Sequence, residues 1–334
     1  MKHYRPPSWL PGGHAQTIYA AMLVPRPRVD YRRTQWNTPD GDFIELDWVD
    51  GPADAPLVVL FHGLEGSSRS HYALSLMHHV RLRGWRGVVP HFRGCGGQPN
   101  RLPRAYHSGD FGEVHWILER MAAQAGAAPC FAAGVSLGGN ALLKWLAVQG
   151  ALAQTWLQAA AAVSAPVDLQ VAGHGLGRGF NRFYTWHFLQ SLRPKSLEKL
   201  RRYPGLYDAR KVAQARNLYD FDELVTAPLH GFASADDYWT RASSKAELRR
   251  IELPTLMVHA RDDPFLPGSH LPRQDEVSTH VTLEYTDAGG HAAFVTGAFP
   301  GRLDWLPLRL LEFFESCPTN VDADSERPAR ANMG

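Results

Sequence analysis

Residues 130–149 read CFAAGVSLGGNALLKWLAVQ, an apolar run and a helix-forming run joined by a glycine-rich turn. The run 130–135 predicts a strand covered on both faces, and 137–149 predicts a helix. The turn Gly134-Val135-Ser136-Leu137-Gly138 satisfies the pattern G-x-S-x-G. So sharp a strand-to-helix turn strains the serine backbone, and flanking glycines allow strand and helix to approach closely. The stretch therefore predicts a nucleophilic serine at a helix N-terminus, where a developing oxyanion is stabilised.

Such a pentapeptide can arise by chance in a chain rich in Gly and Ala, so the surrounding pattern matters. Apolar runs that indicate buried strands recur at 57–61, 87–90, 130–135, 159–164, 255–259 and 281–285. Helical stretches are expected at about 70–83, 109–125, 137–149, 270–278 and 304–315. Strands that alternate with helices predict an α/β protein with a mostly parallel central sheet.

The remaining segments suggest how the chain is divided. Residues 1–28 are rich in Pro and Gly and predict an irregular N-terminal arm, and 29–37 with 42–49 predict an antiparallel hairpin. About 85 residues between the strands near 160 and 256 have helical character and are too many for a structureless loop. We therefore expect a core of 29–169 and 251–317, a helical cap insertion of 170–250, and a disordered tail of 318–334.

The overall composition narrows the functional class. The 334 residues carry a net charge of +2 from 35 basic and 33 acidic residues, which leaves no electrostatic footprint for nucleic acid. Three cysteines are too few for a disulfide framework, and no secretory signal or membrane-spanning stretch is evident. These features predict a cytoplasmic protein with a small-molecule partner, and they leave its oligomeric state open.

The serine requires a base, which in this fold follows the acid and the last strand. His291, after the glycine pair Gly289-Gly290, fits that place, because the glycines let a loop carry the ring toward the serine. His259 lies within a strand run and is interpreted as a core histidine. The other rivals belong to the insertion or precede the last strand: His174, His187, His230, His270 and His280.

The acid should follow the preceding strand, where Asp262 and Asp263 compete. In such folds the acid is followed by a hydrophobic pair and often a proline. Asp263, with Phe265, Leu266 and Pro267 after it, fits that spacing better. The other aspartate is then expected to be a turn residue that binds local backbone N–H groups.

An oxyanion hole needs two backbone donors. The N–H of Leu137, directly after the serine, is one, and the loop after the first long strand should supply the other. That loop begins His62-Gly63-Leu64, so Leu64 is the expected second donor, although a plain glycine turn is the alternative. No zinc spacing or phosphate-binding glycine loop is present, so neither a metal nor a cofactor is expected.

With these motifs in place, the chain resembles the α/β-hydrolases, and more narrowly the YheT family among them. The likeness covers about residues 4–315 and is carried by PSWLPGGHAQT (7–17), HGLEGSS (62–68), FRGCGG (92–97), YHSGD (106–110), GVSLGGN (134–140), FDELVTAPLHGF (221–232), ARDDPFLP (260–267) and GH (290–291). The resemblance implies a Ser–Asp–His carboxylesterase, and eukaryotic relatives act on lipid esters, including monoacylglycerols and phospholipids.

The sequence thus predicts a serine hydrolase that cleaves carboxylic esters of short to medium acyl chains or monoacylglycerol-like lipids. A thioesterase, an amidase or a phospholipase-type enzyme is an alternative, and a non-catalytic binding protein on the same scaffold is another. The insertion should cover the active site and supply an apolar pocket. Its aromatic residues Trp186, Phe188, Tyr219 and Phe232 would then line that pocket, unless they form only the insertion's own core.

Overall fold

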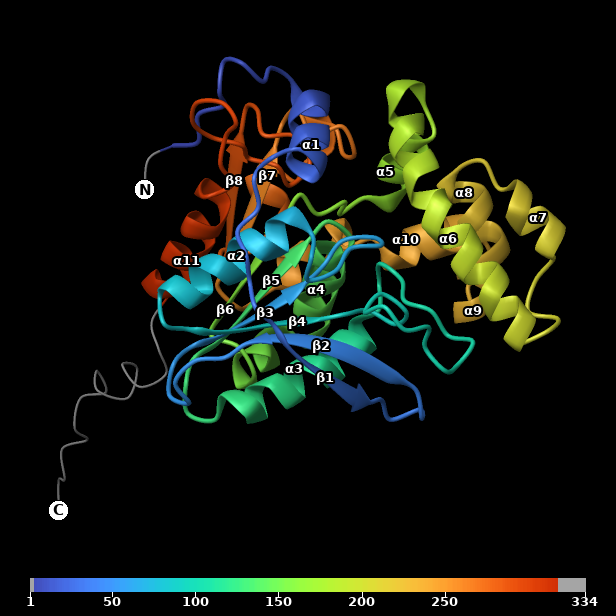
Figure 1. Ribbon diagram of the computed structural model, residues 1–334, viewed down its shortest axis with the longest axis horizontal. Helices are drawn as coiled ribbons and strands as arrows, with labels where there is room; N and C mark the ends of the chain where they lie inside the picture. Colours follow the sequence, from blue (N-terminus) through green and yellow to red (C-terminus); the bar gives the residue numbers. More distant parts are fainter. Residues whose placement is uncertain (1–2, 318–334) are drawn as a thin grey trace.

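The computed structural model describes residues 3–317, which form one eight-stranded sheet with helices on both sides (Figure 1). The strands are β1 (Arg32–Asn37), β2 (Phe43–Val49), β3 (Leu57–Phe61), β4 (Arg86–Pro90), β5 (Cys130–Val135), β6 (Ala159–Val163), β7 (Thr255–Ala260) and β8 (Val281–Thr286). Their order in the sheet is β1-β2-β4-β3-β5-β6-β7-β8. Along this order, every neighbouring pair from β4-β3 to β7-β8 is parallel. The predicted α/β class with a mostly parallel sheet is confirmed.

Each face of the sheet has its own core, as the alternation of side chains in β3 shows. Leu57, Val59 and Phe61 pack in a cluster with residues of α3 (Phe111–Ala125) and α4 (Leu137–Gln149). Val58 and Leu60 point the opposite way and pack with residues of α2 (His71–Leu82) and α11 (Trp305–Ser316). Because both faces are covered, the central strands are apolar throughout.

Most of the expected elements are present, and two differ. The hairpin pairs Arg32 with Trp48 through Asn37 with Phe43. The helix expected at 270–278 is wrong: the structure has only the 3₁₀ turns Gly268–His270 and Gln274–Glu276. Pro272 explains the difference, because it lacks an N–H and disfavours a helical conformation at the residue before it.

The N-terminal arm also contains a helix, α1 (Gly13–Met22), that was not expected. Proline and glycine flank this segment, but Ala, Gln and Met within it favour a helix. Its buried residues Gln16, Thr17 and Ala20 face the body of the protein.

The segment between β6 and β7 is helical, as predicted, and lies beside one end of the sheet (Figure 1). It contains α5 (Leu169–Leu176), α6 (Arg182–Arg202), α7 (Ala209–Gln214), α8 (Leu218–Phe221), α9 (Ala227–His230) and α10 (Ala235–Ala242), with a π-helical turn at Asp222–Thr226. We call residues 170–250 the cap. No helix within residues 3–317 is long and apolar enough to cross a membrane. The tail expected at 318–334 lies outside the described residues.

Candidate active site

Ser136 occupies the sharp turn between β5 and α4. Its φ of 55° and ψ of −122° place a non-glycine residue in a region that side chains disfavour. The Ser136 N–H donates to Val163 O of the neighbouring strand at 2.9 Å, which holds the strained residue in place. Its hydroxyl is therefore presented at the start of α4, beside N–H groups that have no partner within the helix.

The glycines of the turn are required by close contacts rather than by their own φ angles. A Cβ added to Gly138 would lie 2.5 Å from the carbonyl oxygens of Phe61 and His62, so the start of α4 touches the end of β3. A Cβ added to Gly134 would lie 2.5 Å from Gly138 O. The G-x-S-x-G spacing thus lets strand, turn and helix meet without side chains between them.

The structure brings Asp263 and His291 together. His291 Nδ1 lies 2.9 Å from Asp263 Oδ2 and 3.2 Å from Oδ1, and the Asp263 side chain is fully buried. The Phe265 N–H donates to Asp263 Oδ1 at 2.8 Å. Burial opposes ionisation of Asp263, but the charges of His291 and His259 and their hydrogen bonds hold the pKa of that carboxyl well below its usual range. The pair has the geometry that orients an imidazole and stabilises its protonated form.

Asp262 faces the same loop but holds its backbone. Asp262 Oδ1 accepts the N–H of Gly290 at 2.9 Å, and burial raises the pKa of this carboxyl. The next N–H, that of His291, donates to Thr17 Oγ1 of α1 at 2.8 Å. Asp262 and α1 therefore position the histidine loop, a role that the sequence pattern did not reveal because these partners lie far apart in the chain.

Two more residues surround the imidazole. Phe265 stacks on His291 with ring centroids 3.9 Å apart and an interplanar angle of 17°. His259, interpreted from the sequence as a core histidine, is buried, but its Nε2 lies 3.2 Å from Asp263 Oδ2. The Asp263 carboxylate thus faces two histidines.

The loop after β3 leaves one amide free beside the serine. The Gly63 N–H donates to the Tyr72 hydroxyl at 2.8 Å, and the Glu65 N–H donates to the Tyr106 hydroxyl at 2.9 Å. Between them, the Leu64 N–H donates no hydrogen bond to any part of residues 3–317. A Cβ on Gly63 would lie 3.1 Å from Ser136 Cβ, so this loop passes directly over the serine.

His62 fixes the start of that loop. Its Nδ1 lies 2.8 Å from Gly63 O, and its Nε2 accepts the Phe92 N–H at 3.1 Å. Burial, with the nearby His91, lowers the pKa of His62 to about 3, so its ring is neutral at physiological pH. A neutral ring can donate from Nδ1 while it accepts at Nε2, as these two contacts require.

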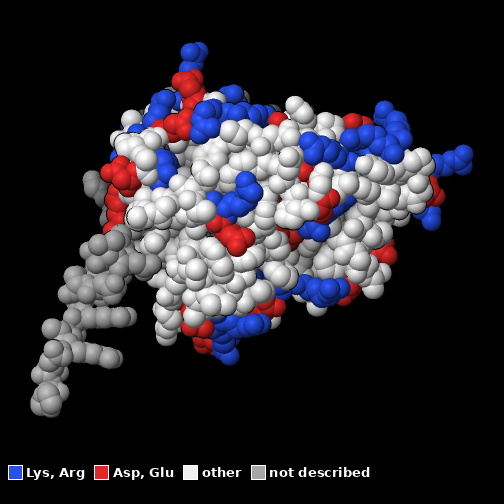
Figure 2. Space-filling view, turned by 90° about the horizontal axis from the view of Figure 1, so that it is seen from below, with Lys and Arg blue, Asp and Glu red and all other residues white. Residues whose placement is uncertain are grey.

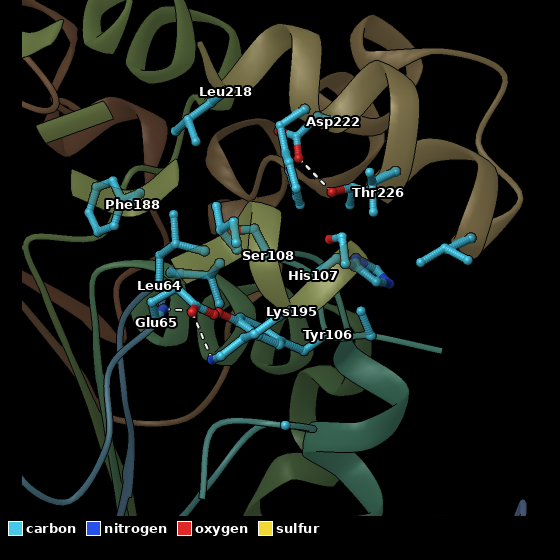
Figure 3. A pocket seen from close by; sticks show the side chains of 18 of the residues that line it. Leu64, Glu65, Tyr106, His107, Ser108, Phe188, Lys195, Leu218, Asp222 and Thr226 are labelled. Carbon is cyan, nitrogen blue, oxygen red and sulfur yellow. Dashed lines mark hydrogen bonds and ion pairs between the residues drawn. The ribbon is translucent and has the colours of Figure 1, made fainter. Parts of the chain in front are cut away.

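Ser136 lies in a cavity of about 300 Å³ between the core and the cap. Leu64 and Leu137 line it from the core, and the cap contributes Leu176, Phe188, Leu192, Leu218, Phe221, Val225 and Leu229. Figure 3 shows Leu64, Phe188 and Leu218 on its wall, with Lys195 of α6 reaching Glu65 at 2.7 Å. Ser136 and His291 share no hydrogen bond within the described chain, but Phe265 links them, since it lines this cavity and stacks on the histidine.

Of the four cap aromatics considered, only Phe188 lines this cavity. Trp186 is 54% exposed, and Tyr219 and Phe232 pack in a cluster within the cap. The cap therefore has both a small core of its own and a wall facing the serine. In another histidine of the cap, His230, Nδ1 lies 2.7 Å from the carbonyl oxygen of Thr226 and Nε2 lies 3.0 Å from that of Ala105.

One buried carboxylate also lines the cavity. Asp222 accepts from the Thr226 hydroxyl at 2.6 Å and from Trp239 Nε1 at 2.8 Å, and burial raises its pKa to about 6. No group of three or more His, Cys, Asp or Glu side chains within residues 3–317 is arranged to hold a metal ion.

Comparison with known proteins identifies the family of the chain. The family described as alpha/beta hydrolase fold matches residues 56–298. Escherichia coli YheT, which is named as an esterase, is 41% identical over 302 residues, with 89% of this chain and 88% of that protein covered. The mouse phospholipase ABHD3 is 30% identical over 323 residues, with 94% and 78% covered.

Solved structures agree with the fold. The Pyrococcus furiosus esterase Pf2001 superposes with a TM-score of 0.54 at 17% identity, covering 87% of this chain and 98% of the esterase. The Butyrivibrio proteoclasticus protein Est1E with ferulic acid bound gives a TM-score of 0.55 at 15% identity, with 86% and 99% covered. The chain belongs to the α/β-hydrolase family, and it is a hydrolase of the esterase and lipase type.

Proposed function

We propose that the protein hydrolyses carboxylic esters with Ser136 as nucleophile, His291 as base and Asp263 as the acid that orients the base. The observation that carries this proposal is the buried contact of 2.9 Å between Asp263 and His291. Phe265 stacks on His291 and lines the cavity that contains Ser136, whose backbone is strained. An imidazole so held accepts a proton at Nε2 and keeps Nδ1 protonated toward the carboxylate.

In the first half-reaction, Ser136 Oγ attacks the ester carbonyl while His291 takes its proton. The oxygen of the tetrahedral intermediate accepts hydrogen bonds from the N–H groups of Leu64 and Leu137, and the alcohol leaves with the proton from His291. Water, deprotonated by His291, then attacks the acyl-enzyme and releases the acid. The free amide of Leu64 supports this assignment, because the hydroxyls of Tyr72 and Tyr106 engage the amides on either side of it.

The substrate should carry an apolar acyl chain, because leucine and phenylalanine side chains of the cap line the cavity of Ser136. Polar and charged cap residues such as Lys195 and Lys199 also line it and would face the polar part of the ester. At about 300 Å³ the cavity suits short to medium chains or a monoacylglycerol-like ester. We further propose that residues 170–250 act as a functional unit that closes this cavity over Ser136.

A lipid hydrolase of the phospholipase type is the second candidate, and the phospholipase relative favours it. Two comparisons separate the alternatives. A fluorophosphonate probe should label the wild type and not Ser136→Ala, whereas a non-catalytic scaffold would label in neither case. Rates on esters, thioesters and phospholipids that carry the same acyl chain then show which leaving group the enzyme prefers. A carboxylesterase should prefer the simple ester.

A further inference from the structure

Three segments that meet at one edge of the molecule contain no Asp or Glu. They are residues 3–29, 169–197 and 288–303. Exposed arginines are present in all three, namely Arg5, Arg26, Arg28, Arg178, Arg182 and Arg302. By contrast, the surface shown in Figure 2 mixes Lys and Arg with Asp and Glu. Arg302 pairs with Asp304, just beyond the third segment, at 3.3 Å, so the positive charge of this edge rests mainly on the other five arginines. The edge is therefore more basic than the whole chain, which is nearly neutral.

Aromatic contacts join these segments into one surface. The Phe299 ring lies 5.5 Å from Trp9, and Trp9 lies 5.1 Å from Tyr19 of α1. At the other end of α1, the His14 ring lies 4.8 Å from Phe180 in the turn between α5 and α6. Figure 1 shows α1 and this turn at the same upper edge of the molecule.

The chain of aromatic contacts continues along α6. Phe180 lies 5.9 Å from Phe183, and Phe183 lies 6.2 Å from Trp186. The spacing of three residues places these rings on one outward side of the cap. We call the surface that runs from Phe299 through α1 to Trp186 the aromatic edge.

The aromatic edge holds most of the exposed apolar side chains. Ten large hydrophobic residues are exposed within residues 3–317, and six of them belong to it: Met22, Leu23, Phe180, Phe183, Trp186 and Phe299. Their exposed fractions run from 40% for Phe183 to 73% for Phe299. Single exposed hydrophobic residues need no explanation, but a joined set bordered by arginines marks an interaction surface.

This edge lies next to the proposed active site. Thr17 of α1 accepts the N–H of His291 at 2.8 Å. Tyr184 of α6 bonds His14 at 3.0 Å and packs on Phe265, which stacks on His291. Helix α6 also turns Phe188 toward the cavity, so one helix joins the aromatic edge to the wall facing Ser136.

We propose that the aromatic edge docks on an anionic lipid surface. Phe and Trp side chains insert favourably at the boundary between headgroups and acyl chains, and arginines around them are attracted to anionic headgroups. A second copy of this chain is a poorer occupant, because a two-fold contact would place arginines against arginines with no acidic residue from these segments to pair them. The inference rests on the proposed function, since a docked cap would take ester substrates directly from the lipid layer.

Vesicle flotation with the full chain tests this docking without any hydrolysis. We expect wild type and Ser136→Ala to float with vesicles of phosphatidylcholine and phosphatidylglycerol, and to float far less with phosphatidylcholine alone. The variant Phe180→Ser/Phe183→Ser/Trp186→Ser should lose at least about tenfold in partitioning. Arg178→Gln/Arg182→Gln should lose about fivefold per arginine on the anionic vesicles.

Matched controls separate docking from general hydrophobicity. Leu82→Ser/Leu152→Ser removes two side chains that are 67% and 64% exposed but lie outside the aromatic edge, and it should float like wild type. The triple variant, the arginine variant and the Leu82→Ser/Leu152→Ser control, none of which alters a residue that lines the cavity of Ser136, should hydrolyse dissolved p-nitrophenyl acetate at the wild-type rate. If the triple variant does not fold, flotation of the arginine variant still tests whether the aromatic edge docks on anionic lipid.

Three results would overturn the proposal. One is a wild-type protein that is active on dissolved esters but does not float with anionic vesicles. Another is equal loss of flotation in the control variant. The third is a wild-type dimer in solution that the triple variant converts to a monomer without any vesicle binding, because a second copy would then cover the edge. A failure of fluorophosphonate labelling would count against the proposed function alone, since flotation does not depend on it.

Discussion

Asp262 and Asp263 are neighbours in the chain, yet they hold different parts of the same histidine loop. Asp263 contacts the His291 imidazole at 2.9 Å, whereas Asp262 accepts the N–H of Gly290 at 2.9 Å. Only the first contact can select a tautomer of the ring, and only the second restrains the backbone that carries it. This division of roles leads to the first predictions.

Asp263→Asn should lower kcat by about 10⁴-fold, because an amide can favour the wrong tautomer of His291. Asp262→Asn should stay within about tenfold of wild type, since an amide oxygen can still accept the Gly290 N–H. Steady-state kinetics on a p-nitrophenyl ester measure both. The opposite ranking would assign the acid to Asp262.

Ser136→Ala and His291→Ala should each lower hydrolysis by about 10⁴-fold or more, because removal of a triad member leaves only residual catalysis from binding and the oxyanion hole. Thermal unfolding should show that both variants remain folded. Wild-type turnover by Ser136→Ala would exclude the proposed mechanism.

The two aspartates should also affect stability with opposite signs as the pH falls. The folded-state pKa of Asp263 is below its ordinary value of 3.8, so its stabilising contribution is present above about pH 4 and is lost on acidification below that. The folded-state pKa of Asp262 is raised, so the folded state gains relative stability as Asp262 takes up a proton.

Urea unfolding between pH 6 and pH 3 measures this difference. Asp263→Asn should lose less free energy of unfolding than wild type over that range, and Asp262→Asn should lose more. Parallel curves for the two variants would show that neither carboxyl has a shifted pKa.

The cap wall should set the preferred acyl chain length. Each methylene buried in the cavity adds up to about 0.8 kcal/mol, so kcat/KM should rise with chain length until the cavity is full and then fall. Phe188→Ala enlarges the cavity and should move the optimum to longer chains. Trp186→Ala is the matched control, because Trp186 lies on the same helix and does not line the cavity. An equal shift in both variants would place the acyl pocket elsewhere.

Gly138→Ala should destabilise the fold by about 3 kcal/mol, since its Cβ would overlap the carbonyl oxygens of Phe61 and His62 at 2.5 Å. Gly112→Ala in α3 meets nothing within 4 Å and should be neutral or stabilising by up to about 1 kcal/mol. Chemical denaturation compares the two directly. Equal stability would mean that β3 and α4 can separate at little cost.

Local pattern was enough to predict the sheet and the place of the serine. Both faces of the central strands are buried, so the strands appear as short apolar runs, and Leu57–Phe61 and Cys130–Val135 have the expected bounds. The G-x-S-x-G turn is likewise a local requirement, because strain and close approach arise within a few residues of Ser136. Helix α1 was missed for a related reason: prolines and glycines around it hid a short helix that is stabilised by tertiary contacts such as Thr17 with His291.

The tertiary structure decided what depends on partners far apart in the chain. Sequence spacing favoured Asp263, but only the fold placed His291 and His259 against its carboxylate and Gly290 against Asp262. The free amide of Leu64 likewise depends on hydroxyls 8 and 42 positions away, those of Tyr72 and Tyr106. The chain itself determined which chemical groups and strands are available. Packing determined which groups meet, because hydrogen bonds and burial act over a few ångströms in space and not along the sequence.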